Sequence, residues 1–146
     1  MNPFVWQARV YWEDTDGGGI VYYANYLRFL ERARTEWLRA QGISQLALAS
    51  NPGVLFSVVA LEAQYHRPAR LDDLLSISCE PQYEGGASIV FAQHVWRGPQ
   101  HGELLLTASV RVACLDAGTL KPRRLPQVIV TGLSVRAAAL GADAKE

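Results

Sequence analysis

The stretch EDTDGGG, residues 13–19, places two aspartates directly before three consecutive glycines. A carboxylate can attack a carbonyl carbon or activate a water molecule, and glycines let a ligand approach the backbone closely. From about Ile20 onward, apolar residues recur at the three- and four-residue spacing of an amphipathic helix. The N-terminus of such a helix offers unpaired N–H groups and partial positive charge, which polarise a carbonyl oxygen. The order of these parts predicts a site that acts on a carbonyl group.

Asp16 is the better candidate of the two acids for this chemistry. The glycines separate Asp16 from the periodic helix, so its side chain can lie beside the first turn instead of capping it. Asp14 is expected to be a loop or capping acid, and capping is the simpler explanation for both aspartates. Tyr22 and Tyr23 would add flat aromatic surfaces beside the helix start. Glu31 is a rival carboxylate, whose simpler role is an ion pair with a nearby arginine of the same helix.

The sequence lacks the signatures of several other chemistries. A dinucleotide fingerprint that began at Gly17 would need glycine or alanine at position 22, where Tyr22 stands. Neither the Gly-Lys-Ser/Thr phosphate loop nor the Gly-x-Ser-x-Gly elbow of serine hydrolases is present. The three histidines lie on different segments, far from any cysteine pair. We therefore expect no metal and no cofactor.

Composition restricts the classes of partner. The chain has 146 residues, enough for one domain, which we expect at residues 1–136 with a flexible tail at residues 137–146. Fourteen basic and fourteen acidic residues cancel, so no charge pattern favours nucleic acid. No apolar run approaches the roughly 20 residues of a membrane span, and the N-terminus does not resemble a secretion signal. We interpret Cys79 and Cys114 as reduced core residues of a cytoplasmic protein.

Periodicity indicates the elements that must position the site. Residues 4–13 have the aromatic and β-branched composition of a strand, and the helical pattern runs from about Ile20 to Gln41. Short turns separate the later strand-like segments, which favours antiparallel hairpins. We expect four of these strands, near residues 54–66, 75–80, 89–95 and 106–114. A single helix can bury a broad apolar face only against a sheet that curls around it, which predicts an α+β fold. A second copy would cover the edge strands.

Three stretches resemble the motifs of hotdog-fold acyl-CoA thioesterases of the 4-hydroxybenzoyl-CoA thioesterase family. They are YWEDTDGGGIVYYANYLRFLERARTEWL at residues 11–38, HRPARLDDLL at residues 66–75 and DAGTLKPRRLP at residues 116–126. They are most similar to the YbgC-type branch, which is associated with the Tol-Pal system. The resemblance implies a long central helix wrapped by a curled antiparallel five-stranded sheet. It also implies pairing through a continuous sheet into homodimers or homotetramers, and a role in lipid metabolism.

The resemblance assigns roles to residues of the opening stretch. The second aspartate of the motif is the family's catalytic carboxylate, so this role falls on Asp16, either as nucleophile or as general base. The thioester carbonyl would be held by the backbone N–H of Tyr23, a position at which many members of the branch carry histidine. N–H groups of the whole turn would stabilise the developing oxyanion, and these belong to Gly19, Ile20, Val21, Tyr22 and Tyr23.

The substrate implied is an acyl-CoA, with acyl carrier protein as a second possible donor. Coenzyme A carries phosphates, which arginine and lysine bind well. We expect Lys121, Arg123 and Arg124 to bind them, followed by Arg67 and Arg70. Tyr65, His94 and Trp96 are expected to be core or sheet-face residues. The alternative function is a non-enzymatic module that binds acyl-CoA or acyl carrier protein in lipid or envelope machinery. A hotdog hydratase is disfavoured, because its histidine would stand at position 21.

Overall fold

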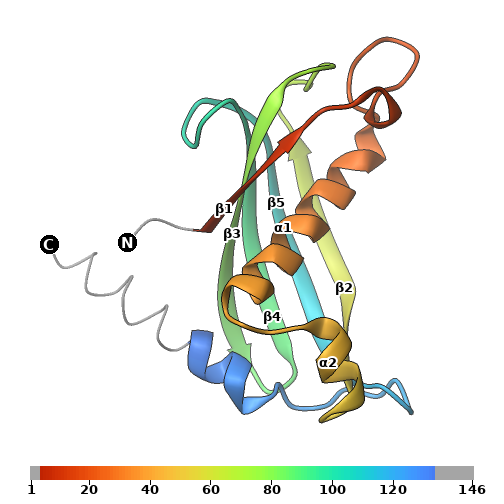
Figure 1. Ribbon diagram of the computed structural model, residues 1–146, viewed down its shortest axis with the longest axis vertical. Helices are drawn as coiled ribbons and strands as arrows, with labels where there is room; N and C mark the ends of the chain where they lie inside the picture. The colour runs from red at the N-terminus through yellow and green to blue at the C-terminus, as the bar shows by residue number, and fades with distance from the viewer. Residues whose placement is uncertain (1–3, 134–146) are drawn as a thin grey trace, which may run out of the picture.

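The computed structural model describes residues 4–133, so the tail predicted at residues 137–146 lies outside the described residues. Its strands are β1 (Phe4–Arg9), β2 (Val54–Tyr65), β3 (Leu74–Gly85), β4 (Ser88–Arg97) and β5 (Glu103–Asp116), and its helices are α1 (Tyr26–Ala40) and α2 (Gln45–Ser50), with 3-10 turns η1 (Trp12–Asp14) and η2 (Tyr23–Asn25). The five strands form one antiparallel sheet in the order β1-β3-β4-β5-β2, which curls around α1 (Figure 1). The predicted α+β arrangement is confirmed.

The sheet has an apolar and a polar face because its strands alternate as predicted. On β4, Ile89, Phe91 and Val95 are buried on the face toward α1. His94 and Trp96 lie on the other face, where their rings stack with centroids 5.4 Å apart. The prediction that these two residues lie on a sheet face is therefore correct.

Helix α1 presents one continuous buried stripe to the sheet. Tyr26, Phe29, Leu30, Ala33 and Trp37, each no more than 3% exposed, repeat at intervals of three and four residues along it. The Trp37 ring meets the Phe91 ring edge-on, with centroids 5.6 Å apart. This stripe fixes how α1 is rotated about its own axis and therefore which way its N-terminal turn faces.

Helix α1 begins later than the periodicity predicts. The pattern predicts a start near Ile20, whereas α1 begins at Tyr26 and has 15 residues. Ile20 and Val21 are instead paired with a distant segment. The Val21 N–H donates to the carbonyl of Ala69 at 2.9 Å, and Ile20 forms a bridge with Arg70. Helical spacing of apolar residues cannot reveal that a segment fifty positions away competes for the same backbone groups.

Two other boundaries differ from the prediction. Strand β1 ends at Arg9 and not at Glu13, because the chain then turns into η1, which contains Glu13 and Asp14. The expected single helix is accompanied by α2 and by a helical segment at residues 127–133. The Ser44 side chain caps α2 by accepting a hydrogen bond from the Ala47 N–H at 3.2 Å.

The two cysteines are core residues, as predicted. Cys79 and Cys114 are both buried, and neither forms a disulfide. Among residues 4–133, the helices are all too short or too polar to cross a bilayer.

Among residues 4–133, the edge strand β2 keeps apolar side chains exposed. Helix α1 packs mainly on β3 and β1, while β2 forms the opposite edge of the sheet. On β2, Val58, Val59 and Leu61 are 46%, 57% and 38% exposed. A long edge strand with exposed apolar side chains is a surface that proteins normally cover.

Candidate active site

Asp16 lies in a tight loop that folds back on the chain. Thr15 and Val21 form an antiparallel bridge, and the Asp16 N–H donates to the Ile20 carbonyl at 2.8 Å. The glycines form the tip of this loop. Gly19 has a φ of +79°, a conformation that residues with a side chain rarely adopt. The run of glycines therefore has a structural cause as well as the functional one inferred from the sequence.

The carboxylate of Asp16 is exposed and held at one oxygen. Oδ1 accepts a hydrogen bond from the Gly18 N–H at 2.7 Å. A Cβ atom added at Gly18 would lie 3.3 Å from the same oxygen, closer than most such contacts. Within residues 4–133 no group bonds to Oδ2. One oxygen is thus fixed in direction while the other is available to a substrate or a water molecule.

In the part of the chain that the structure describes, no side chain caps the helix N-terminus next to this loop. Tyr22 occupies the N-cap position of η2, and its side chain accepts no capping hydrogen bond. The N–H groups of Tyr23 and Ala24 come first in the turn, before any carbonyl of the same turn can accept them. The Asn25 N–H is the first to find one, at 2.8 Å from the carbonyl of Tyr22. Tyr23 and Ala24 therefore offer the open donors at this end of the helix.

Three of the other N–H groups predicted as oxyanion donors already have acceptors. Gly19 donates to Asp16, Val21 to Ala69 and Tyr22 to Asp14, at 3.2, 2.9 and 3.0 Å. These bonds hold the shape of the turn. Of the predicted donors, the N–H groups of Ile20 and Tyr23 are left without an acceptor among residues 4–133, and Tyr23 is the one that the resemblance indicates.

Tyr65 contacts the helix start, a role that the sequence did not suggest. Its hydroxyl donates to the Tyr23 carbonyl at 2.7 Å. Its ring meets that of Tyr26 edge-on at 5.5 Å, and the Tyr26 hydroxyl accepts from the Ala69 N–H at 2.9 Å. Partial burial raises the pKa of Tyr65 above its usual value, so its hydroxyl stays a donor to higher pH than that of an exposed tyrosine. The only signal for Tyr65 in the sequence was its position near the end of the strand predicted at residues 54–66.

Asp14 is a structural acid, as expected. It is 6% exposed, and its carboxylate accepts from the Tyr11 N–H and from the Asn25 side-chain amide, both at 2.8 Å. It is therefore turned into the protein, whereas Asp16 is turned toward solvent.

Comparison with known proteins identifies the family to which this arrangement belongs. The family model described as thioesterase superfamily matches residues 18–103, more than half of the chain. The chain belongs to this superfamily. An acyl-CoA thioester hydrolase, YbgC, from Escherichia coli O6:H1 is 47% identical over 127 residues, which cover 87% of this chain and 92% of that protein. An acyl-CoA thioesterase, YbgC, from Haemophilus influenzae is 43% identical, with coverages of 88% and 92%.

Solved structures agree with this assignment. A probable thioesterase from Bartonella henselae superposes with a TM-score of 0.79 at 40% identity, covering 86% of this chain and all of the other (100%). A 1,4-dihydroxy-2-naphthoyl-CoA thioesterase from Synechocystis gives a TM-score of 0.83 over 91% and 96% of the two chains, but at 22% identity it supports the fold alone. The expected hotdog fold and the resemblance to the YbgC-type branch are confirmed, and the protein is a thioester hydrolase.

Of the predicted phosphate-binding cations, Arg70 lies beside the Asp16 loop, and Arg67 begins the segment that leads to Arg70. Arg70 bridges to Ile20, and its neighbour Leu71 donates its N–H to the Gly19 carbonyl at 3.3 Å. Arg67 is exposed at the start of the same segment, with its Nε 3.5 Å from Glu103. Both guanidinium groups belong to the segment that holds the Asp16 loop in place.

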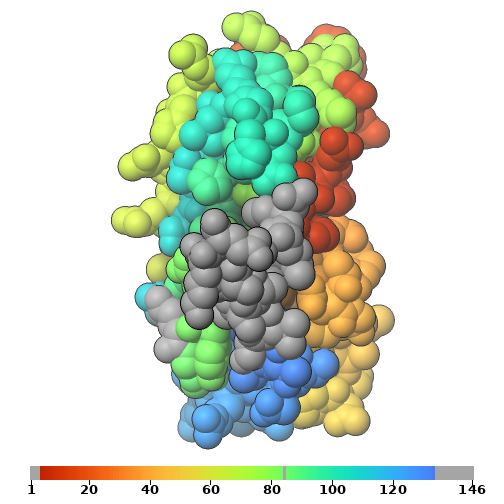
Figure 2. All heavy atoms as spheres, turned by 90° about the vertical axis from the view of Figure 1, so that its left-hand side faces the viewer, coloured from red at the N-terminus to blue at the C-terminus, as the bar shows by residue number. Residues whose placement is uncertain are grey.

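The other three predicted cations are not brought to this loop within one chain. The segment that follows β5 and carries Lys121, Arg123 and Arg124 lies at one end of the molecule, in blue, in both views (Figures 1 and 2). The loop that precedes α1 lies at the opposite end (Figure 1). Arg123 already donates to the Pro52 carbonyl at 2.9 Å and lies 3.4 Å from Asp116. Its guanidinium fastens the turn before β2 to the end of β5.

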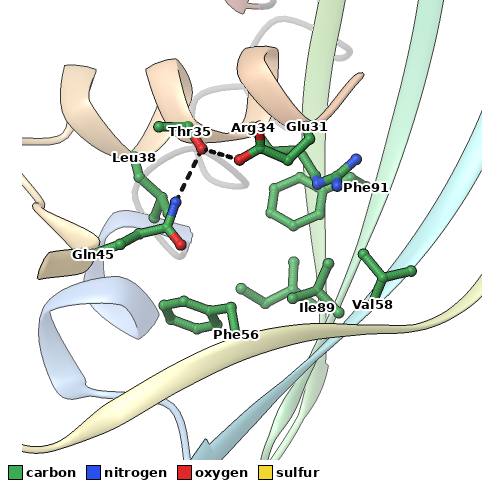
Figure 3. Close-up of a pocket in the computed structure, with 10 residues that line it drawn as sticks. Glu31, Arg34, Thr35, Leu38, Gln45, Phe56, Val58, Ile89 and Phe91 are labelled. Atoms are coloured by element: carbon green, nitrogen blue, oxygen red, sulfur yellow. Dashed lines mark hydrogen bonds between the residues drawn. The ribbon is translucent and has the colours of Figure 1, made fainter. Parts of the chain in front are cut away.

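Glu31, the rival acid, lines a separate pocket of the thioesterase. Its carboxylate accepts from the Thr35 hydroxyl at 2.7 Å (Figure 3). Arg34 donates to Gln93 at 3.0 Å. The expected ion pair of Glu31 with an arginine is therefore wrong for the described residues, since none lies in range. The pocket, about 110 Å³, lies between α1, α2 and β2 and excludes Asp16. Its remaining lining residues include Leu38, Gln45, Phe56, Val58, Ile89, Phe91 and Val112.

Proposed function

We propose that this thioesterase hydrolyses acyl-CoA thioesters to a free carboxylic acid and coenzyme A, with Asp16 as the catalytic carboxylate and the Tyr23 N–H as the main oxyanion donor. One observation carries the proposal. Asp16 has a free oxygen on a loop that pairs with residues 20–22, and these residues lead directly into the uncapped turn. The curated relatives, which are named acyl-CoA thioesterases, support the substrate class.

The reaction needs a developing negative charge to be stabilised. The thioester carbonyl oxygen lies against the Tyr23 N–H, and Ala24 supplies a second donor. Such donors contribute most when charge forms on the oxygen, and removing one typically costs about 2.7–4 kcal/mol in the transition state. The helix dipole of α1 adds to this stabilisation.

Asp16 acts at the carbonyl carbon by one of two routes. As a general base, it takes a proton from water while the water oxygen attacks, and the C–S bond then breaks to release the thiolate, which receives the proton. As a nucleophile, it forms a mixed anhydride with loss of the thiolate, and water then cleaves the anhydride. Both routes require the unbonded Oδ2 to point at the substrate, with Oδ1 held by Gly18.

Charge around the loop fits a phosphate-bearing substrate. Arg67 and Arg70 bind the coenzyme A phosphates in our proposal, because both belong to the segment that contacts the loop. A phosphopantetheine arm on acyl carrier protein presents the same thioester and is an alternative donor. We place the reaction in the cytoplasm and in lipid metabolism, and the unpaired thiols of Cys79 and Cys114 are consistent with a reducing compartment.

We further propose that two copies pair through β2 into a homodimer, which can assemble into a homotetramer. The exposed apolar side chains of this edge strand support the pairing. Antiparallel pairing of the same strand across a two-fold axis sets opposite ends of the two copies side by side. The segment with Lys121, Arg123 and Arg124 from one copy would then lie toward the Asp16 end of the other, where it can add to phosphate binding.

The test of the catalytic role is Asp16→Asn in a thiol-release assay with short-chain, long-chain and aromatic acyl-CoA. We expect kcat to fall by about 10²–10⁴-fold, the usual contribution of an acid or base in the reaction. Glu13→Gln is the matched control, since Glu13 is an exposed acid three positions away, and it should retain activity. Wild-type rates from Asp16→Asn would remove Asp16 from the mechanism. A wild-type protein that binds acyl-CoA and hydrolyses none would be the binding module instead.

The test of the pairing is Val59→Lys, which places a charge on the exposed edge, 57% exposed in one copy. Light scattering after size exclusion should then report a monomer. Leu46→Lys is the control, because Leu46 is 84% exposed on α2 and should leave the mass unchanged. A dimer that survives Val59→Lys would argue against β2 as the interface.

A further inference from the structure

Asp14 is a buried acid without a buried cation. It is 6% exposed, and within residues 4–133 it forms no ion pair with lysine, arginine or histidine. A buried carboxylate is costly unless its oxygens accept hydrogen bonds. Here Oδ2 accepts from the Tyr11 N–H and Oδ1 from the Asn25 side-chain amide, both at 2.8 Å. The carboxylate is therefore kept at this position by two specific donors.

Asp14 also binds Tyr22, the residue at the other end of the turn that starts the helix. The backbone carbonyl of Asp14 accepts from the Tyr22 N–H at 3.0 Å. Tyr22 and Asn25 stand on either side of Tyr23 and Ala24, whose N–H groups are the open donors of the turn. Asp14 thus holds both ends of the four-residue turn that carries these donors.

Asp14 is only two positions from Asp16, and the residue between them is also fixed. The Thr15 N–H and hydroxyl both donate to the Trp12 carbonyl, at 3.1 and 2.8 Å, and Thr15 bridges to Val21. A displacement of Asp14 is therefore passed to Asp16 on one side and to Tyr23 on the other.

We propose that Asp14 and Asn25 form a positioning clamp, which sets the distance and angle between the Asp16 carboxylate and the N–H groups of Tyr23 and Ala24. The catalytic consequence of this inference rests on the proposed function, whereas the clamp itself concerns only the geometry of the turn at residues 22–25. Neither residue touches substrate. Their effect is on kcat, because a misplaced donor weakens transition-state binding more than ground-state binding.

The hydrogen-bond pattern allows a test by exchange of the two side chains. Asn25→Asp alone sets two carboxylates face to face. Asp14→Asn alone can keep both bonds, because the Asn25 amide can turn over and its oxygen, which no residue among 4–133 binds, then accepts from the new amide N–H. The double variant Asp14→Asn/Asn25→Asp restores both bonds: the amide oxygen at position 14 accepts from Tyr11, and its N–H donates to the carboxylate at position 25. Net charge is unchanged in the double variant.

We expect Asn25→Asp to lower kcat by up to about 10²-fold, the cost of a 1 Å misplacement, with little change in KM, and Asp14→Asn to lower kcat much less. The double variant should recover at least about tenfold of that loss, as expected for directly coupled groups. Glu13→Gln is the control for removal of a nearby acid. A wild-type kcat in Asn25→Asp, or a folded double variant as slow as Asn25→Asp alone, would overturn the clamp.

Backbone amide exchange separates the clamp from the proposed reaction. The Tyr22 and Asn25 N–H groups should exchange faster in Asn25→Asp and return toward wild-type protection in the double variant. Unchanged protection in a well-folded Asn25→Asp variant would overturn the clamp whatever the activity. If the wild type hydrolyses no thioester while the exchange pattern follows this expectation, the proposed function fails and the clamp stands.

Discussion

Substitutions at the glycine tip of the loop can shift the Asp16 carboxylate without changing its charge. Gly17 and Gly18 are neighbours, and neither has the positive φ that Gly19 has. A Cβ atom at Gly17 would meet nothing within 4 Å, whereas a Cβ at Gly18 would lie 3.3 Å from Asp16 Oδ1. At that distance the carboxylate must move by a few tenths of an ångström. Gly17→Ala and Gly18→Ala therefore differ almost only in their effect on Asp16.

The magnitude follows from that displacement. A misplacement of 1 Å costs about 10²-fold in rate, so a few tenths of an ångström should lower kcat by about three- to tenfold in Gly18→Ala. Both substitutions reduce the freedom of the unfolded chain, which raises the free energy of unfolding by about 0.4–1 kcal/mol where the native backbone accepts alanine. Gly17→Ala should thus keep wild-type kcat and gain a little stability.

The measurements are steady-state thiol release and thermal unfolding of the two variants side by side. Equal kcat values in Gly17→Ala and Gly18→Ala would refute the view that the Asp16 carboxylate position controls the rate. A loss of stability in Gly18→Ala that matches its loss of rate would assign the effect to the loop as a whole.

Three further outcomes are expected. Tyr65→Phe removes the hydroxyl bonded to Tyr23 and should lower kcat by less than the about 10²-fold lost with a direct oxyanion donor, measured by thiol release. Burial raises the pKa of Tyr26 above 10.0, so its protonated hydroxyl contributes stability that is complete below pH 10 and is lost as pH rises through the folded-state pKa. Unfolding temperatures between pH 9 and 11 should show a smaller decline in Tyr26→Phe than in the wild type. Arg67→Gln with Arg70→Gln should raise KM for acyl-CoA and weaken its salt dependence, and an unchanged KM would remove both from phosphate binding.

The sheet and the buried face of α1 could be predicted because local periodicity decides them. Period-two alternation marks β4, and apolar residues at three- and four-residue spacing mark Phe29, Leu30, Ala33 and Trp37. The start of α1 could not be predicted in this way, because the Val21 N–H donates to the carbonyl of Ala69, far along the chain. A single sequence carries no direct sign of that pairing.

Some residues of the candidate site could likewise be predicted from local sequence, and others could not. Asp16 stood out because an acid before a glycine run and a helical pattern is a local feature. Tyr65 and Asn25 did not, since their parts in the site come from bonds to Tyr23 and Asp14 that only the fold creates. Lys121, Arg123 and Arg124 were chosen by charge alone, and charge does not show which end of a molecule a segment will occupy.

The late start of α1 is the physical condition for the proposed chemistry. Had the helix begun at Ile20, the glycines would have stood in line with its axis, and an acid before them would have capped the first turn. Instead, residues 20–22 run antiparallel to residues 14–16, so the chain reverses once before the helix begins. The reversal leaves the helix N-terminus without a carboxylate cap among the described residues and puts Asp16 on the other, antiparallel arm of the loop. An uncapped turn and an unneutralised acid can then face the same substrate from two directions, which a continuous helix could not provide.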